Sequence, residues 1–79
     1  MPNKLFAERL NHELSEIGVP ESNSERVEAF AKLLKIPKFK AATYLNGQTL
    51  PDEEKLSHLA GELEVSVDWL IGKSEDKTC

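Results

Sequence analysis

The residues with the clearest chemical potential are four lysines in the middle of the chain. They are Lys32, Lys35, Lys38 and Lys40. The segment from Val27 to Gly47 that holds them contains a single acidic residue, although the whole chain carries a formal net charge of -4. Because clustered cationic side chains attract anions, a basic patch on an acidic chain predicts a specific surface for an anionic partner. A solvated helix face is the alternative explanation of the same run of lysines.

The composition limits the remaining possibilities. A chain of 79 residues has room for one domain, near the lower size of a self-sufficient core. Its 39% hydrophobic content is typical of a small folded domain and not of a disordered chain. The negative net charge argues against binding nucleic acid or anionic membrane over the whole surface. Since the only cysteine is Cys79, no disulfide framework can form within the chain.

The N-terminus MPNKLFAERLNHEL lacks the apolar run of a signal peptide. No segment of the chain approaches the length of a membrane span. We therefore expect a soluble, cytoplasmic protein that has no membrane partner.

Hydrophobic spacing predicts an all-α chain with five helices and no strand. The expected helices cover residues 3–17, 25–34, 37–45 and 67–71, and a further helix follows the cap Asp52 and carries an apolar stripe of Leu56, Leu59, Ala60 and Leu63. In the first helix one apolar face is formed by Phe6, Leu10, Leu14 and Ile17. The expected N-caps are Ser24, Asp52 and Ser66, and the expected helix stops are Gly18, Asn46-Gly47 and Gly72. We divide the chain into a domain over residues 1–73 and a polar, mobile tail over residues 74–79.

The second and third expected helices are joined by a tight turn at Lys35-Ile36, and Pro37 is suited to begin the next helix. A helix pair that reads DNA needs a small residue where the helices cross, and Ala31 meets that need. Projection of the third helix at about 100° per residue puts Ala41 and Tyr44 inward. The opposite face then carries Phe39, Ala42 and Thr43, with Lys38 and Lys40 beside it.

Three sequence segments follow one another in this chain: FAKLLKIPKFKAATYLNG, the proline of QTLP, and LSHLAGELEVSVDWLIG. In this order and spacing they resemble the lambda-repressor-like family, the helix-turn-helix proteins of the phage repressor and Cro type. The resemblance extends from Phe6 to about Lys73. It implies a five-helix DNA-binding domain whose third helix enters the major groove while the second lies across the DNA backbone.

The resemblance also implies roles for individual residues. Lys38, Phe39 and Thr43 match the base-contacting positions, and Phe39 could touch a thymine methyl or instead turn into the space left by Ala41. Phosphate contacts are implied for Arg26, Lys40, Asn46 and Gln48. A homodimer is implied, with Trp69 and Ile71 at its interface; closure of the core is the other role for that apolar cluster.

Three positions depart from the family pattern. Lys35 occupies the turn position where glycine is usual, so a left-handed backbone or a wider turn is expected there. Ala41 replaces a larger aliphatic residue. The loop between the first two helices is longer than in compact members, which affects where Arg26 lies.

The sequence gives little support for catalysis, because no nucleophile, histidine and orienting acid form a recognisable set and no glycine-rich phosphate loop is present. We expect no metal site at His12 or His58, no cofactor and no small-molecule ligand. The favoured function is a sequence-specific regulator that binds double-stranded DNA as a homodimer on an inverted-repeat operator, most often as a repressor. The alternatives are an antitoxin-like DNA-binding protein that also sequesters a protein partner, and a pure protein-interaction module.

Overall fold

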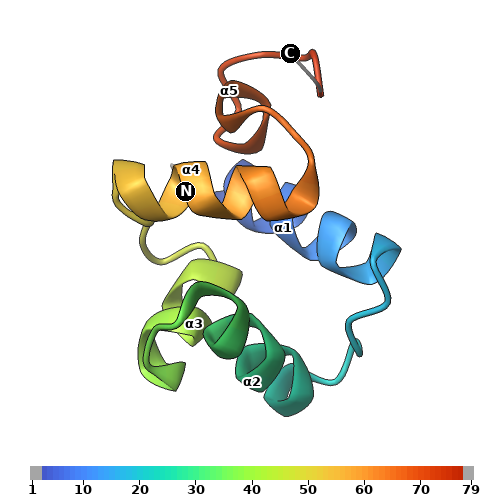
Figure 1. Cartoon of the computed structure of the whole chain (residues 1–79), viewed down its shortest axis with the longest axis vertical. Coiled ribbons are helices and arrows are strands. Elements are labelled where there is room, and N and C mark those ends of the chain that lie inside the picture. The colour runs from blue at the N-terminus through green and yellow to red at the C-terminus, as the bar shows by residue number, and fades with distance from the viewer. Residues whose placement is uncertain (1–2, 78–79) are drawn as a thin grey trace.

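The computed structural model describes residues 3–77, which form five helices (Figure 1). The helices are α1 (Lys4–Glu16), α2 (Asn23–Leu34), α3 (Lys38–Leu45), α4 (Glu53–Leu63) and α5 (Val67–Leu70). No strand occurs within residues 3–77, so the all-α prediction is confirmed. In Figure 1, α2 and α3 form one end of the long axis and α5 lies at the opposite end. None of the described helices is long and apolar enough to cross a membrane.

A single hydrophobic core receives side chains from all five helices. Its most completely buried large members are Phe6, Phe30, Leu10, Leu14, Leu34, Leu59 and Leu70. They recur at the three- and four-residue spacing that places side chains on one helix face. Ile17 was predicted to continue the buried face of α1, but its side chain is 54% exposed because α1 ends at Glu16 and the chain turns away.

All five helices end with the same backbone arrangement. One residue after α2 and α4, and two residues after α1, α3 and α5, the backbone has a positive φ, and the amide of that residue donates to the carbonyl three residues earlier. The next amide donates to the carbonyl five residues earlier, which completes a Schellman motif. Glycine occupies three of these positions, as predicted, while Lys35 and Glu64 occupy the other two with φ of 57° and 58°. Of the two alternatives expected at Lys35, the left-handed backbone is the one found, and the left-handed backbone at Glu64 was not predicted.

Two of the three predicted N-caps are confirmed. Asp52 Oδ1 accepts a hydrogen bond from the Lys55 amide at 2.9 Å, and Ser66 Oγ accepts from the Trp69 amide at 3.0 Å. The prediction for Ser24 is wrong, because α2 already begins at Asn23. The first helical hydrogen bond runs from the Arg26 amide to the Ser22 carbonyl at 2.8 Å, so Ser24 lies inside the first turn.

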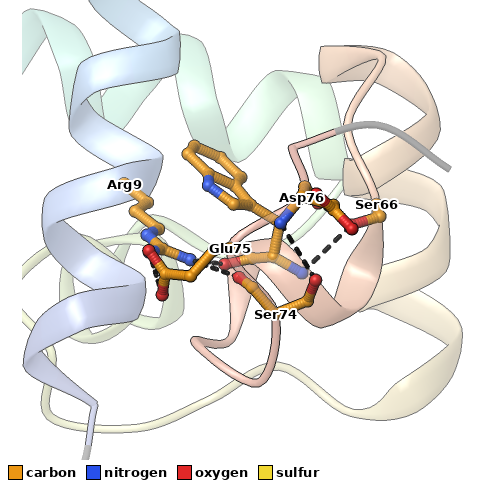
Figure 2. A network of polar contacts seen from close by, with 6 residues as sticks. Arg9, Ser66, Ser74, Glu75 and Asp76 are labelled. Atoms are coloured by element: carbon orange, nitrogen blue, oxygen red, sulfur yellow. Dashed lines mark hydrogen bonds and ion pairs between the residues drawn. The ribbon is translucent and has the colours of Figure 1, made fainter.

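The segment after α5 packs back onto the helices, although the sequence predicted a mobile tail. Ser66 donates from its amide to the Lys77 carbonyl at 2.7 Å and from its hydroxyl to the Asp76 carbonyl at 3.1 Å. Figure 2 shows Arg9 of α1 reaching the same segment, where its guanidinium donates to the Ser74 carbonyl at 3.1 Å. These contacts fix residues 74–77 against α1 and α5. Thr78 and Cys79, the rest of the predicted tail, lie outside the described residues.

Candidate functional site

Helix α3 is held in place from its inner side. Pro37 precedes it, and the Pro37 carbonyl accepts hydrogen bonds from the amides of Lys40 and Ala41, each at 3.1 Å. Ala41 is fully buried and Tyr44 is 8% exposed, as the helical projection predicted. The closest helical neighbour of α3 is α2, from which a turn of residues 35–37 separates it. These contacts leave the opposite face of α3 open to solvent.

Phe39 projects from that open face. Its side chain is 69% exposed, the highest value among the large hydrophobic residues of the described chain. The alternative in which Phe39 turns into the space beside Ala41 is therefore wrong for this structure, because Phe39 does not belong to the core that contains Ala41, Tyr44 and Leu45. A solvent-exposed aromatic ring on a packed helix is available for contact with a partner.

A shallow depression of about 350 Å³ lies beside Phe39. It is lined by Phe39, Lys40, Thr43, Tyr44, Thr49 and Leu50. Leu50 is 41% exposed, and the loop brings it here because the Thr49 amide donates back to the Thr43 carbonyl at 3.4 Å. Sequence reasoning missed Thr49 and Leu50. No pattern in the sequence indicated them, because their position depends on the path of the loop after α3.

The Thr43 hydroxyl already has two hydrogen-bond partners. It donates to the Lys40 carbonyl at 2.8 Å and accepts from the Thr49 hydroxyl at 3.0 Å. A hydroxyl group has one proton and two lone pairs, so one acceptor position and the side-chain methyl remain for a partner.

The loop after α3 exposes Asn46 and Gln48. Asn46 Oδ1 accepts from the Gln48 amide at 3.2 Å, which stiffens the turn. In the described part of the chain, the amide nitrogens of both side chains remain without an intramolecular acceptor. Both residues can therefore donate hydrogen bonds to a partner that contacts the end of α3.

The four lysines do not form one continuous basic patch. Glu28 lies between two of them, with its carboxylate 3.5 Å from Lys32 Nζ and 4.0 Å from Lys38 Nζ. Lys35 lines a different depression, together with Glu54 and Lys55. Of the four, Lys40 is the one that lies at the exposed face of α3 with no carboxylate within 4.0 Å among residues 3–77.

Arg26 does not lie with the other predicted phosphate-contacting residues. It is 7% exposed, and its guanidinium donates five hydrogen bonds into the end of α1 and the following loop. The acceptors are the carbonyls of Pro20, Asn11 and Val19, Asn11 Oδ1 and Ser15 Oγ. Because these bonds occupy the guanidinium, Arg26 is not available for a phosphate contact in this structure. The long loop after α1, noted as a departure from the family pattern, supplies two of the acceptors.

Trp69 and Ile71 are partly buried at the α5 end. Two cations lie over the Trp69 ring, with Arg9 Cζ 4.7 Å and Lys77 Nζ 5.6 Å from its centroid. Arg9 also donates to the Trp69 carbonyl. Trp69 and Ile71 thus pack against the core and retain accessible surface, and their place in a dimer interface stays a prediction.

Comparison of the chain with models of known protein families, with curated proteins and with solved structures finds no match in any of the three. Within residues 3–77 no group of three or more His, Cys, Asp or Glu side chains is arranged to hold a metal ion.

Proposed function

We propose that this protein is a sequence-specific regulator that binds double-stranded DNA through a helix-turn-helix formed by α2 and α3. In this proposal α3 enters the major groove and α2 lies across the DNA backbone. The protein acts as a repressor by occupying its operator. The lambda-repressor-like pattern of the sequence motivates the proposal, and the outer face of α3 carries it.

The decisive observation is an exposed face on a helix that is otherwise firmly packed. Ala41 and Tyr44 fix the inner side of α3, while Lys38, Phe39 and Lys40 are exposed on its outer side within residues 3–77. A helix with side chains is about 10–12 Å across, and the major groove is about 12 Å wide. A rigid, cationic helix of eight residues fits such a groove.

The proposed contacts divide into two groups. Lys40, Asn46 and Gln48 bind phosphates and set the register of the protein on DNA. Lys38, Phe39 and Thr43 face the base edges. Arg26 is left out of the phosphate group, and its role is to hold the α1–α2 loop on which the position of α2 depends.

We propose that two copies bind together through the α5 end, with Trp69 and Ile71 in the contact. Since α5 lies at the far end from α3, such a contact leaves both copies of α3 free (Figure 1). The two chains must then meet at an angle, so that both α3 helices reach one face of the DNA.

The apolar surface formed by Phe39 and Leu50 is the observation that favours the alternative, a protein-interaction module. Selection of bound sequences from a random DNA pool separates the two. Enrichment of a common motif, with affinity that falls by about 0.9 log unit per log unit of salt for each phosphate neutralised, supports the DNA-binding function. No enrichment, together with no binding at low salt, rules that function out.

A further inference from the structure

We propose that the depression beside Phe39 recognises the 5-methyl group of a pyrimidine in the major groove. This subsite rests on the proposed DNA-binding function and assigns to it a specific base feature. It adds Leu50, a residue outside α3, to the reading surface.

The first argument is the concentration of exposed apolar surface. Four large hydrophobic residues of the described chain are exposed, and two of them, Phe39 and Leu50, line this one depression. Exposed apolar side chains that gather at one place usually mark a contact surface. The depression contains no acidic residue, and its only charged lining residue is Lys40. That charge favours a polyanion that also presents an apolar group.

The second argument is that the hydroxyl protons of the two lining threonines are already used. Thr49 donates to Thr43 at 3.0 Å, and Thr43 donates to the Lys40 carbonyl at 2.8 Å. The two threonines therefore offer methyl groups and acceptor lone pairs but no free proton. In the major groove the apolar group that base pairs offer is the C5-methyl of thymine, and 5-methylcytosine presents the same methyl. Tyr44 lines the depression as well, so the match to a 5-methylpyrimidine rests on the apolar surface of Phe39, Leu50 and the threonine methyl groups.

The test uses the operator obtained by selection and replaces each thymine of a half-site in turn by deoxyuridine. This replacement removes the methyl and keeps every hydrogen-bonding group. At one position per half-site we expect the affinity to fall about 4-fold, which is the equivalent of about 0.8 kcal/mol for one buried carbon group. At the same position, 5-methylcytosine paired with guanine should bind about 4-fold tighter than cytosine. If neither methyl changes the affinity at any position, the proposal is wrong.

Two variants connect the effect to the depression. Phe39→Ala and Leu50→Ala should each bind thymine and deoxyuridine operators equally, because the apolar contact has been removed. Phe39 is 69% and Leu50 41% exposed, and neither belongs to the buried core, so both variants should fold; circular dichroism verifies this. Lys40→Ala is the matched control, since it should lose affinity for all sequences and keep the preference for thymine.

The possible failures are distinguishable. A wild-type protein that binds its operator in a salt-dependent manner but ignores the methyl overturns the subsite and leaves the DNA-binding function intact. The subsite is also wrong if Phe39→Ala keeps the full preference for thymine over deoxyuridine. It is likewise wrong if Phe39→Ala binds every DNA sequence as tightly as the wild type, and the exposed ring is then available to a protein partner. Absence of salt-dependent DNA binding overturns the function itself.

Discussion

Substitution of Arg26 separates two roles that this residue could have, a contact to DNA phosphate and a structural role inside the fold. As a phosphate contact, it would contribute to DNA affinity and little to stability. As the buried donor of five hydrogen bonds, it fastens the loop of residues 17–22 and the end of α1 to α2. We predict that Arg26→Ala and Arg26→Lys both destabilise the fold. Lysine keeps the charge, but its compact ammonium cannot reproduce the planar fork of five N–H donors.

The expected loss is about 2–4 kcal/mol. A hydrogen bond to a charged group is worth about 1.5–3 kcal/mol, but the five are not additive, because Ser15 and Pro20 lie at the surface and regain water. At about 0.05–0.15 kcal/mol per residue, a chain of 79 residues has a total stability of about 4–12 kcal/mol. Since 1 kcal/mol shifts the midpoint of a domain of this size by about 4–8 °C, the Tm should fall by roughly 10–30 °C.

Thermal and urea unfolding followed by circular dichroism measure this loss. The salt dependence of DNA binding, measured at a low temperature at which the variants remain folded, provides the second readout. Arg26→Lys should leave the salt slope unchanged, while the control Lys40→Ala should lower the slope by about 0.9 and leave the Tm unchanged. If Arg26→Ala keeps the wild-type Tm and loses one phosphate contact in the slope, the structural role assigned to Arg26 is wrong.

Three further predictions follow from particular contacts. Glu28→Gln should raise DNA affinity about 2- to 5-fold, because it frees Lys38 and Lys32 from a competing carboxylate; filter binding at two salt concentrations tests this, and unchanged affinity contradicts it. Lys35→Gly should raise the free energy of unfolding by about 0.5–1 kcal/mol, because the strain energy of a left-handed lysine is larger than the conformational entropy that glycine loses on folding. A lower urea midpoint would refute this prediction. Trp69→Glu should weaken pairing of two chains on DNA while the monomer stays folded, as checked by sedimentation and circular dichroism; undiminished pairing would exclude Trp69 from the interface.

The helices and the core were predictable because they follow from local rules. Apolar residues spaced three or four apart determine which helix faces are buried, and this rule placed Ala41 and Tyr44 inside and Phe39 outside. At Lys35 a left-handed backbone or a wider turn was expected, because this residue occupies the turn position where the resembled family usually has glycine. Its counterpart Glu64 has the same geometry but lies among residues that carry no turn signal.

The contacts that were missed depend on residues far apart in the sequence. A charged residue on a helix is usually exposed, so the sequence favoured a surface role for Arg26, whose acceptors on α1 and the loop become visible only in three dimensions. Residues 74–77 are polar, and polar chain ends usually lack partners, so the sequence indicated mobility. In the structure, Arg9 and Ser66, which are distant in the sequence or on another element, donate hydrogen bonds to that segment. Leu50 lies beside Phe39 because of the path that the loop after α3 follows, and the spacing of apolar residues in the sequence does not predict that path.

The central claim is that two copies of α3 read one operator. The most direct test is the stoichiometry and affinity of the purified chain on the selected DNA, with intact and half-site operators compared by sedimentation. We predict an enriched inverted repeat whose half-site centres lie roughly 10 base pairs, about 34 Å, apart, with two chains bound and much weaker binding to an isolated half-site. One chain bound with full affinity to a single half-site, and no gain from the second half-site, would contradict the account.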